Sequence, residues 1–200
     1  MSSSDDECPL EFAQRSIHEI SEISSILDDA FFLRFDIFEF TKLTDRPLLV
    51  LGFYLLSRHP ILQDLYQQKK VDLVHCATFL DLCERLYQKV PYHNSTHATD
   101  VLQFNMLLLS SSFAQHHLMD YEVLTAAMCA VVHDAGHSGR NNDYLVKSNH
   151  ELARRFNKVS CLEQYHIEMV CSTNESMSMY SLNSMIPTLC TLSIYHLFAR

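Results

Sequence analysis

The stretch AAMCAVVHDAGHSG, residues 126–139, decides how this chain of 200 residues folds. Its first seven residues are small or apolar on every side, which is typical of a helix buried at the centre of a domain. We expect that helix to span residues 120–132. His133 and Asp134 follow at once, and two glycines in the next five residues indicate a tight loop. Polar groups beside a buried helix are costly unless they are bonded, so this pair is expected to bind a metal or to form hydrogen bonds.

Helical patterns extend on both sides of this stretch. Apolar residues recur at three-to-four spacing from Ile17 to Leu27, and the Phe-rich segment 31–40 is interpreted as a short irregular segment leading to a helix. Further helices are expected over residues 48–57, where Pro47 opens the helix, and over residues 71–87. Another is expected to begin at an N-cap, Asn94 or Ser95, and to run to Leu109. A last one is expected to start near Asn142 and to carry Leu145, Leu152, Ala153 and Phe156.

The composition supports an all-α domain. Only 3 Gly and 5 Pro supply too little turn chemistry for a many-stranded sandwich or barrel. A charged fraction of 20% with 48% hydrophobic residues excludes disorder for most of the chain. The net charge of −9 argues against a nucleic-acid polymer as partner, because phosphate neutralisation needs clustered Lys and Arg.

The cysteines and the N-terminus indicate a cytoplasmic protein. Seven scattered cysteines without a C-x-x-C pair favour reduced, mostly buried thiols over a disulfide framework or a zinc finger. The N-terminus, MSSSDDECPL, is polar and acidic, unlike a secretory signal. The longest early apolar run, residues 48–56, is far shorter than the roughly 20 residues that cross a bilayer, so no transmembrane segment is expected.

Four of the 12 histidines form two pairs at a spacing of four, His93 with His97 and His133 with His137. A helix would place both members of a pair on one face. One such pair arises easily by chance in a His-rich helix, whereas two pairs with the adjacent Asp134 favour a site for a divalent metal. A carboxylate can also bridge two ions.

Several ordered motifs resemble one family. The chain is similar to the catalytic domain of class I cyclic nucleotide phosphodiesterases, which are HD-type metallohydrolases, over roughly residues 31–170. The motifs that carry the resemblance are FDIFEFTKLTDRPL (35–48), YHNSTHATDVLQ (92–103), HDAGHSGRNNDYL (133–145), SNHELARRFN (148–157) and LEQYH (162–166). The resemblance implies a compact all-α, multi-helix domain that is present here as its N-terminal portion.

The resemblance also implies a division of the chain. We expect an N-terminal extension, partly disordered, over residues 1–30, a partial catalytic domain over 31–171, and a divergent tail over 172–200. In the family, an aspartate that completes the first metal site and a nucleotide-binding glutamine lie well beyond the H-D pair. No residue of the tail aligns with them, so we expect a C-terminally truncated domain with greatly reduced or absent hydrolysis if the chain is complete as given.

By resemblance, the function is metal-dependent hydrolysis of cAMP or cGMP to nucleoside 5′-monophosphates in signal transduction. Two divalent ions are implied, zinc in the first site and magnesium or manganese in the second, with no further cofactor. The implied metal ligands are His97, His133 and Asp134, and Asp134 is shared between the two ions. The expected partner is the cyclic nucleotide substrate, with dimerisation also considered.

Other motif positions receive supporting roles from the resemblance. His93 becomes the general acid, His137 orders water on the second ion, and Glu163 lies near the metal-bound waters. For His166, two interpretations have about even weight. It is either a hydrogen-bonded histidine on the inner face of a helix or a residue with a role near the metals. Asn142 and Asn94 match positions of the family's motifs, but capping or loop hydrogen bonds explain these two residues equally well.

Departures from the family pattern and two rival functions remain. Ser138 replaces a proline, and Gln164 and Tyr165 replace the usual Asn and His, but no ligand is lost. One rival is a catalytically impaired fragment that binds metal or a partner. The other is a different HD-type phosphohydrolase acting on deoxynucleotides or signalling dinucleotides, against which the string YHN-x-x-HA-x-D argues.

Overall fold

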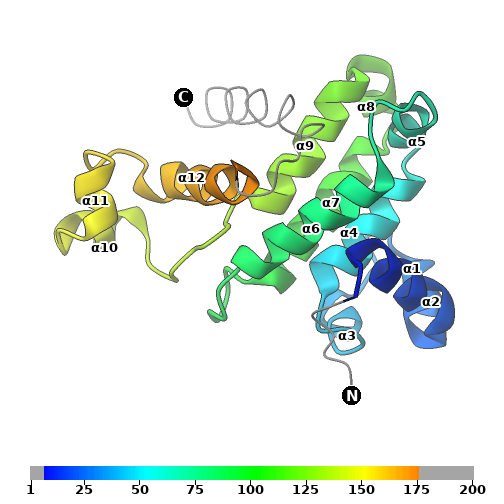
Figure 1. The fold of residues 1–200 in the computed structure, drawn as a ribbon, viewed down its shortest axis with the longest axis horizontal. Coiled ribbons are helices and arrows are strands. Elements are labelled where there is room, and N and C mark those ends of the chain that lie inside the picture. Colours follow the sequence, from blue (N-terminus) through cyan, green and yellow to red (C-terminus); the bar gives the residue numbers. More distant parts are fainter. Residues whose placement is uncertain (1–6, 176–200) are drawn as a thin grey trace.

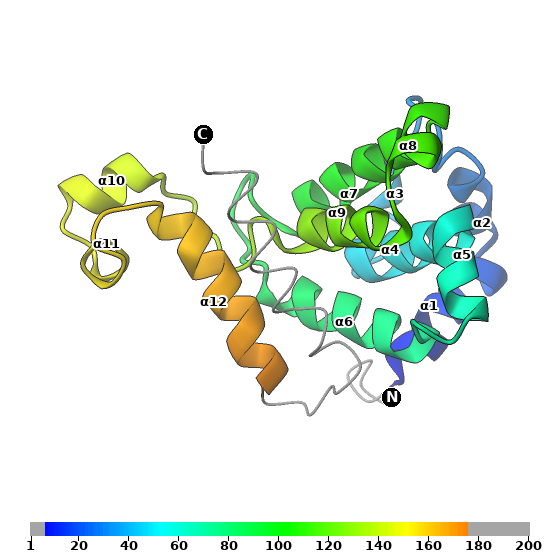
Figure 2. The ribbon, with the colours of Figure 1, turned by 90° about the horizontal axis from the view of Figure 1, so that it is seen from above.

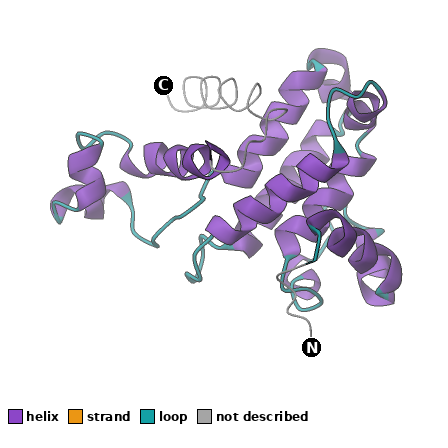
Figure 3. Ribbon diagram, viewed as in Figure 1, coloured by secondary structure: helices purple, strands orange, loops and turns teal. Residues whose placement is uncertain are grey.

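A computed structural model describes residues 7–175, and over this range the regular structure is entirely helical (Figure 3). The expected all-α fold is confirmed. The twelve helices in this range are α1 (Pro9–Glu19), α2 (Ser21–Leu27), α3 (Ile37–Phe40), α4 (Pro47–Arg58), α5 (Pro60–Gln67), α6 (Leu73–Leu86), α7 (Ser95–Leu109), α8 (Ser112–His117), α9 (Asp120–Val132), α10 (Asn142–Lys147), α11 (Glu151–Arg155) and α12 (Cys161–Glu175).

Helix α4 forms the centre of the main body, where it packs against α1, α6 and α7, while α7 also packs against α9 (Figure 1). Nine of the twelve residues of α4 are buried, as its apolar sequence predicts. A Cβ atom at Gly52 would lie 2.9 Å from Leu80 of α6 and 3.2 Å from Leu102 of α7. The absence of a side chain at this position therefore permits the close approach of α4 to both neighbours.

A buried carboxylate joins α6 to the start of α4. Glu84 of α6 accepts hydrogen bonds from the backbone N–H groups of Leu48 and Leu49, at 2.8 and 3.1 Å. These N–H groups have no partner within their own helix, because the first turn of any helix leaves its donors unpaired. Burial raises the pKa of Glu84 to about 7 despite these hydrogen bonds.

The N-terminal helices are part of the packed body, because α1 contacts both α4 and α6. The Arg46 guanidinium lies over the Phe12 ring of α1 at 4.8 Å and forms an ion pair with Asp81 of α6. Segment 31–40 consists of turns followed by α3, as expected. The domain boundary at residue 30 itself stays a prediction.

One helical expectation is wrong. The segment expected as one helix from Asn142 to Phe156 forms two short helices, α10 and α11, and Phe156 lies just after the second. The backbone turns at Asn149, whose φ of 53° is left-handed, a conformation that asparagine tolerates better than most residues. His150 then starts α11 by accepting the N–H of Leu152 on its Nδ1.

Helices α10 and α11 lie beyond one end of the main body, and α12 runs back toward it (Figure 2). A second, small apolar cluster holds this part together, with Leu145, Ala153, Cys161 and Leu162 as its buried members. Because α12 also contacts α6 and α9, it brings its motif residues against the end of the central bundle.

Two further features of residues 7–175 concern the cysteines and membrane-spanning helices. The six cysteines in this range are free thiols, three of them buried. None of the helices in the described part is both long enough and apolar enough to cross a membrane. The predicted divergent tail lies, apart from the end of α12, outside the described residues.

Candidate metal centre

The junctions of two helices bring the central histidines together. His133 and Asp134 follow the last residue of α9, and His97 lies in the first turn of α7. Asn94 fixes that turn, because its Oδ1 accepts the N–H of His97 at 3.2 Å while its Nδ2 donates to the Val90 carbonyl at 2.9 Å. The expected N-cap at Asn94 is therefore confirmed.

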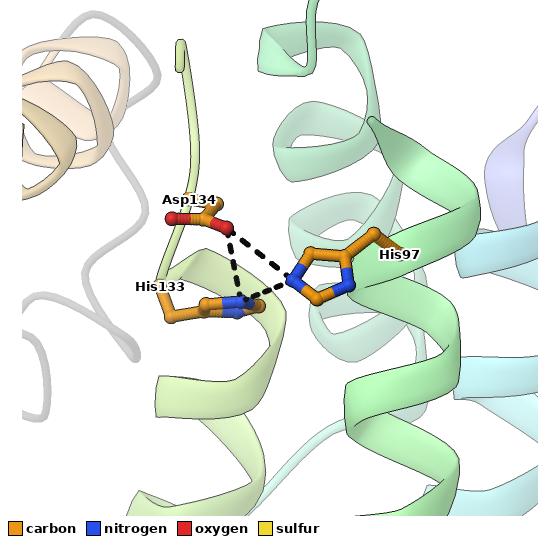
Figure 4. A group of neighbouring side chains, drawn as sticks. All are labelled: His97, His133 and Asp134. Atoms are coloured by element: carbon orange, nitrogen blue, oxygen red, sulfur yellow. Dashed lines mark hydrogen bonds and ion pairs between the residues drawn. The ribbon is translucent and has the colours of Figure 1, made fainter. Parts of the chain in front are cut away.

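Three ligand atoms converge on one point between α7 and α9 (Figure 4). The Nε2 atoms of His97 and His133 are 3.2 Å apart. Each lies close to Oδ2 of Asp134, at 3.4 Å from His97 and 3.3 Å from His133. The structure thus brings together the three residues that the resemblance implies as metal ligands.

The hydrogen bonding and spacing of this group fit a zinc-like ion. The Nδ1–H of His133 donates to the Ala130 carbonyl at 2.9 Å, so its Nε2 carries a lone pair directed at the other two atoms. Ligands around tetrahedral zinc, with bonds of roughly 2.0–2.1 Å, are separated by about 3.3 Å. The three separations match that value, so the three atoms could hold a cation between them.

Metal binding needs neutral imidazoles and an ionised carboxylate, and the pKa shifts of His97 and Asp134 suit it. Burial, and then the neighbouring His133, lower the pKa of His97. For Asp134, burial opposes ionisation, but the hydrogen bond and charge of His133 outweigh it and lower the pKa to about 2. For His133, burial lowers the pKa, but the hydrogen bond and charge of Asp134, together with the Ala130 carbonyl, outweigh it and raise the pKa. A metal ion would therefore displace a proton from this ring.

A second group of ligand atoms shares Asp134 with the first. Asp134, His137 and His166 each offer one atom within 4.8 Å of the others, and both histidines are buried. Nε2 of His166 lies 3.7 Å from Oδ1 of Asp134, the carboxylate oxygen that does not face His97. The sequence alone left the role of His166 evenly balanced, and the structure places it beside Asp134.

A glycine permits this contact. Gly136 has a φ of +76°, which L side chains rarely adopt, and its backbone N–H donates to the Leu86 carbonyl. A Cβ atom there would lie 3.1 Å from the ring of Tyr165 and 3.2 Å from Met169, both on α12. Gly136 therefore lets α12 approach closely enough for His166 to reach Asp134.

His93 borders the same centre from the loop before α7. Its Nε2 lies 4.0 Å from Oδ2 of Asp134, its ring stacks on that of His137 with centroids 3.8 Å apart, and about a third of its side chain is exposed. His93, His137 and Glu163 share a pocket of about 500 Å³ with Arg140. His93 is thus the histidine of the group with the most open access to a molecule in that pocket.

Glu163 is held in place by Asn142. The Asn142 Nδ2 donates to both carboxylate oxygens of Glu163, at 3.2 and 3.0 Å, and its Oδ1 accepts the N–H of Leu162 at 3.0 Å. The side chain therefore fastens the start of α10 to the start of α12. Hydrogen bonding accounts for Asn142, one of the two readings that the sequence left open.

Comparison with known proteins assigns this arrangement to a family. A sequence model described as 3′5′-cyclic nucleotide phosphodiesterase matches residues 92–189, which include both groups of ligand residues. The chain carries part of a class I cyclic nucleotide phosphodiesterase catalytic domain. The resemblance seen in the motifs is confirmed.

Curated relatives bear names of the same family. The chain is 34% identical to 3′,5′-cyclic-AMP phosphodiesterase 4 of Dictyostelium discoideum, over 66% of this chain and 12% of the relative. It is 36% identical to the high affinity cAMP-specific and IBMX-insensitive 3′,5′-cyclic phosphodiesterase 8 of Drosophila melanogaster, over 72% of this chain and 16% of the relative. It is also 36% identical to the dual specificity calcium/calmodulin-dependent 3′,5′-cyclic nucleotide phosphodiesterase 1B of Bos taurus, over 68% of this chain and 25% of the relative. The chain therefore spans a quarter or less of these relatives.

Proposed function

We propose that this chain supplies the metal-binding part of a site that hydrolyses 3′,5′-cyclic nucleotides to nucleoside 5′-monophosphates. The observation that carries the proposal is the convergence of His97, His133 and Asp134, whose ligand atoms lie 3.2–3.4 Å apart. The names of the relatives, which include cAMP-specific and dual-specificity enzymes, support a cyclic nucleotide as substrate.

The donor set favours zinc in the first position, where two imidazole nitrogens and one carboxylate oxygen meet. We propose magnesium or manganese in the family's second position, on the other oxygen of Asp134. Divalent ions in such a pair supply a water nucleophile at neutral pH and neutralise the charge of the phosphate. The chain's own part is to hold Asp134 between the two positions, with Oδ2 toward His97 and Oδ1 toward His166.

The hydrolysis itself needs a proton donor, and we propose His93. Water oxygen bonds to phosphorus as the bond from phosphorus to the ribose 3′-oxygen breaks, and the departing oxygen takes a proton from Nε2 of protonated His93. The proton that the water loses passes to solvent, from which His93 is protonated again. This ring lies at the pocket, is partly exposed, and is held in place by stacking on His137.

Two neighbours would order water in the same pocket. The Nδ1 of His137 accepts the N–H of Gly139 at 2.9 Å, so in the neutral ring the proton is on Nε2, which can donate to a water. Burial, and then the charge of His93, lower the pKa of His137 and keep it neutral. Glu163, oriented by Asn142, offers carboxylate oxygens that can accept from waters in the pocket.

The experiment compares two variants with the unaltered chain in bound zinc. Turnover of cAMP and cGMP, with added Mn²⁺ or Mg²⁺, is compared for the same variants in the whole catalytic domain of which this chain is a part. We expect His93→Ala to keep its zinc and to lower turnover by roughly 100-fold or more. We expect His97→Ala to lose both. Zinc loss in His93→Ala would mean that His93 is a metal ligand and not the general acid. Turnover that survives removal of all divalent ions would contradict the mechanism.

The same assay separates the rival functions. Bound zinc without turnover in the unaltered chain would support a metal-binding fragment, and faster hydrolysis of deoxynucleotides or dinucleotides would support another HD-type phosphohydrolase. A role in signal transduction, a cytoplasmic location and dimerisation accompany the proposal as predictions.

A further inference from the structure

We infer that Arg140 binds the phosphate of the nucleotide in the pocket beside the metal centre, and that it binds the 5′-monophosphate product more strongly than the cyclic substrate. The inference rests on the proposed function, because it names a substrate-binding residue for the same reaction. The sequence motifs include Arg140 without giving it a role.

Arg140 supplies positive charge to the pocket of about 500 Å³ that it shares with His93, the proposed proton donor. Among the described residues that line this pocket, Arg140 alone has a fixed positive charge, and Glu163 is the one carboxylate. The chain has a net charge of −9, so an anionic nucleotide approaches a molecule of like charge. A local cation in the pocket therefore strongly affects where such an anion binds.

The carboxylates closest to this part of the chain have other partners. Both oxygens of Glu163 accept hydrogen bonds from Asn142, at 3.2 and 3.0 Å. Asp143, three residues after Arg140, forms an ion pair with Lys147 at 2.8 Å. Over residues 7–175, no carboxylate forms an ion pair with Arg140, and its guanidinium N–H groups donate to no described acceptor. The donors of this side chain can therefore serve a ligand.

The ring of Tyr144 orients the guanidinium. The central carbon of the Arg140 guanidinium lies 4.7 Å from the centroid of this ring, and both side chains line the pocket. The N-cap Asn141 lies between the two residues, and its Oδ1 accepts the N–H of Tyr144 at 2.9 Å, which fixes the backbone of this turn. A ring contact covers one face of a planar guanidinium, whereas its N–H donors point outward from the edge. The edge can thus bind two phosphate oxygens in the bidentate geometry that arginine favours.

The charge of the phosphate differs between substrate and product. A 3′,5′-cyclic nucleotide is a phosphodiester with a single negative charge. A 5′-monophosphate is a monoester that carries roughly −1.5 to −2 charges at neutral pH and has three terminal oxygens. Because the attraction to a cation grows with the charge of the anion, Arg140 should bind the product more strongly than the substrate.

The test uses the whole catalytic domain of which this chain is a part, with divalent ions bound, and compares Arg140→Ala with Arg58→Ala. Arg58 is a matched control, because its guanidinium also lies over a tyrosine ring, that of Tyr54 at 4.2 Å, and its loss changes the net charge equally. It ends α4 next to α5, which lies at the opposite end of the described structure from α10 (Figure 1). Hydrolysis of cAMP and cGMP gives KM and kcat. Calorimetry measures the binding of 5′-AMP, of 5′-GMP and of the two nucleosides, which lack the phosphate.

The expected effect is a selective loss of phosphate binding. Arg140→Ala should raise KM by about 3- to 10-fold without a fall in kcat, and should weaken 5′-monophosphate binding by about 5- to 30-fold. Nucleoside binding should not change. Arg140→Lys should restore part of the loss, because lysine keeps the charge but not the planar fork. High ionic strength should reduce the difference between Arg140→Ala and the unaltered domain, since salt screens exposed charges.

Three results would overturn the inference. These are equal 5′-monophosphate affinities in Arg140→Ala and Arg58→Ala, equal losses of nucleoside and 5′-monophosphate binding in Arg140→Ala, and a fall in kcat with an unchanged KM. Absence of turnover of both cyclic nucleotides by the unaltered domain would instead contradict the proposed function. The binding titrations would still decide the role of Arg140 in that case, so the two failures are distinguishable.

Discussion

Replacing Gly136 with alanine should loosen the contact between the H-D loop and α12. The left-handed backbone, with φ +76°, costs about 1–2 kcal/mol for a residue with a Cβ atom. The new atom would lie 3.1 Å from Tyr165 and 3.2 Å from Met169, and such overpacking costs about 1–3 kcal/mol more. We therefore expect a loss of about 2–5 kcal/mol in the free energy of unfolding.

Gly139→Ala is the matched control, because it has the same kind of backbone and more space. Its φ is +80°, and the nearest atoms to a new Cβ belong to Val90, at 3.6 and 3.7 Å. Only the backbone cost of about 1–2 kcal/mol should appear there. Urea unfolding of each variant, followed by circular dichroism, measures both losses of stability.

The two variants should differ in stability because only Gly136 lies against α12. Equal losses of unfolding free energy in both variants would refute the argument that Gly136 permits the close approach of α12.

Two further predictions concern the main body. Burial raises the pKa of Glu84 to about 7, so its protonated form stabilises the fold below about pH 4.5, and roughly 3 kcal/mol is lost as pH rises to 7. Glu84→Gln should flatten the pH dependence of urea unfolding in that window, and an unchanged profile would refute it. Tyr87→Phe removes the buried hydrogen bond to the Val131 carbonyl, of 2.8 Å, and should lower the unfolding free energy by about 1–2 kcal/mol in the same assay, whereas no loss would contradict that role.

The parts of the fold that depend on residues close together in the sequence were predictable from it. Asn94 starts α7 as expected, because an N-cap needs only a side-chain oxygen and the N–H groups two or three residues on. The all-round apolar segment before His133 forms the buried helix α9. The pattern from Asn142 to Phe156 misled, because its apolar spacing does not reveal the left-handed turn at Asn149.

Contacts between residues far apart in the chain could not be predicted. The N–H groups of Leu48 and Leu49 meet Glu84 only because α4 packs on α6, and no local pattern marks that carboxylate as a cap. The approach of His166 to Asp134 likewise depends on how α12 packs beside Gly136. The spacing of the histidine pairs indicated a metal site, and the resemblance implied its ligands and a role for His137 at a second ion, whereas the position of His166 beside Asp134 became visible only in three dimensions.

The most direct test of the metal centre is the zinc content of the purified chain and of two variants, measured by elemental analysis after dialysis. We expect about one tightly bound zinc in the unaltered chain, from the two imidazoles and the carboxylate of the first group. His97→Ala and Asp134→Ala should each bind zinc at least roughly 100-fold more weakly. Unchanged zinc in both variants, at full occupancy, would contradict the assignment of His97, His133 and Asp134 as its ligands.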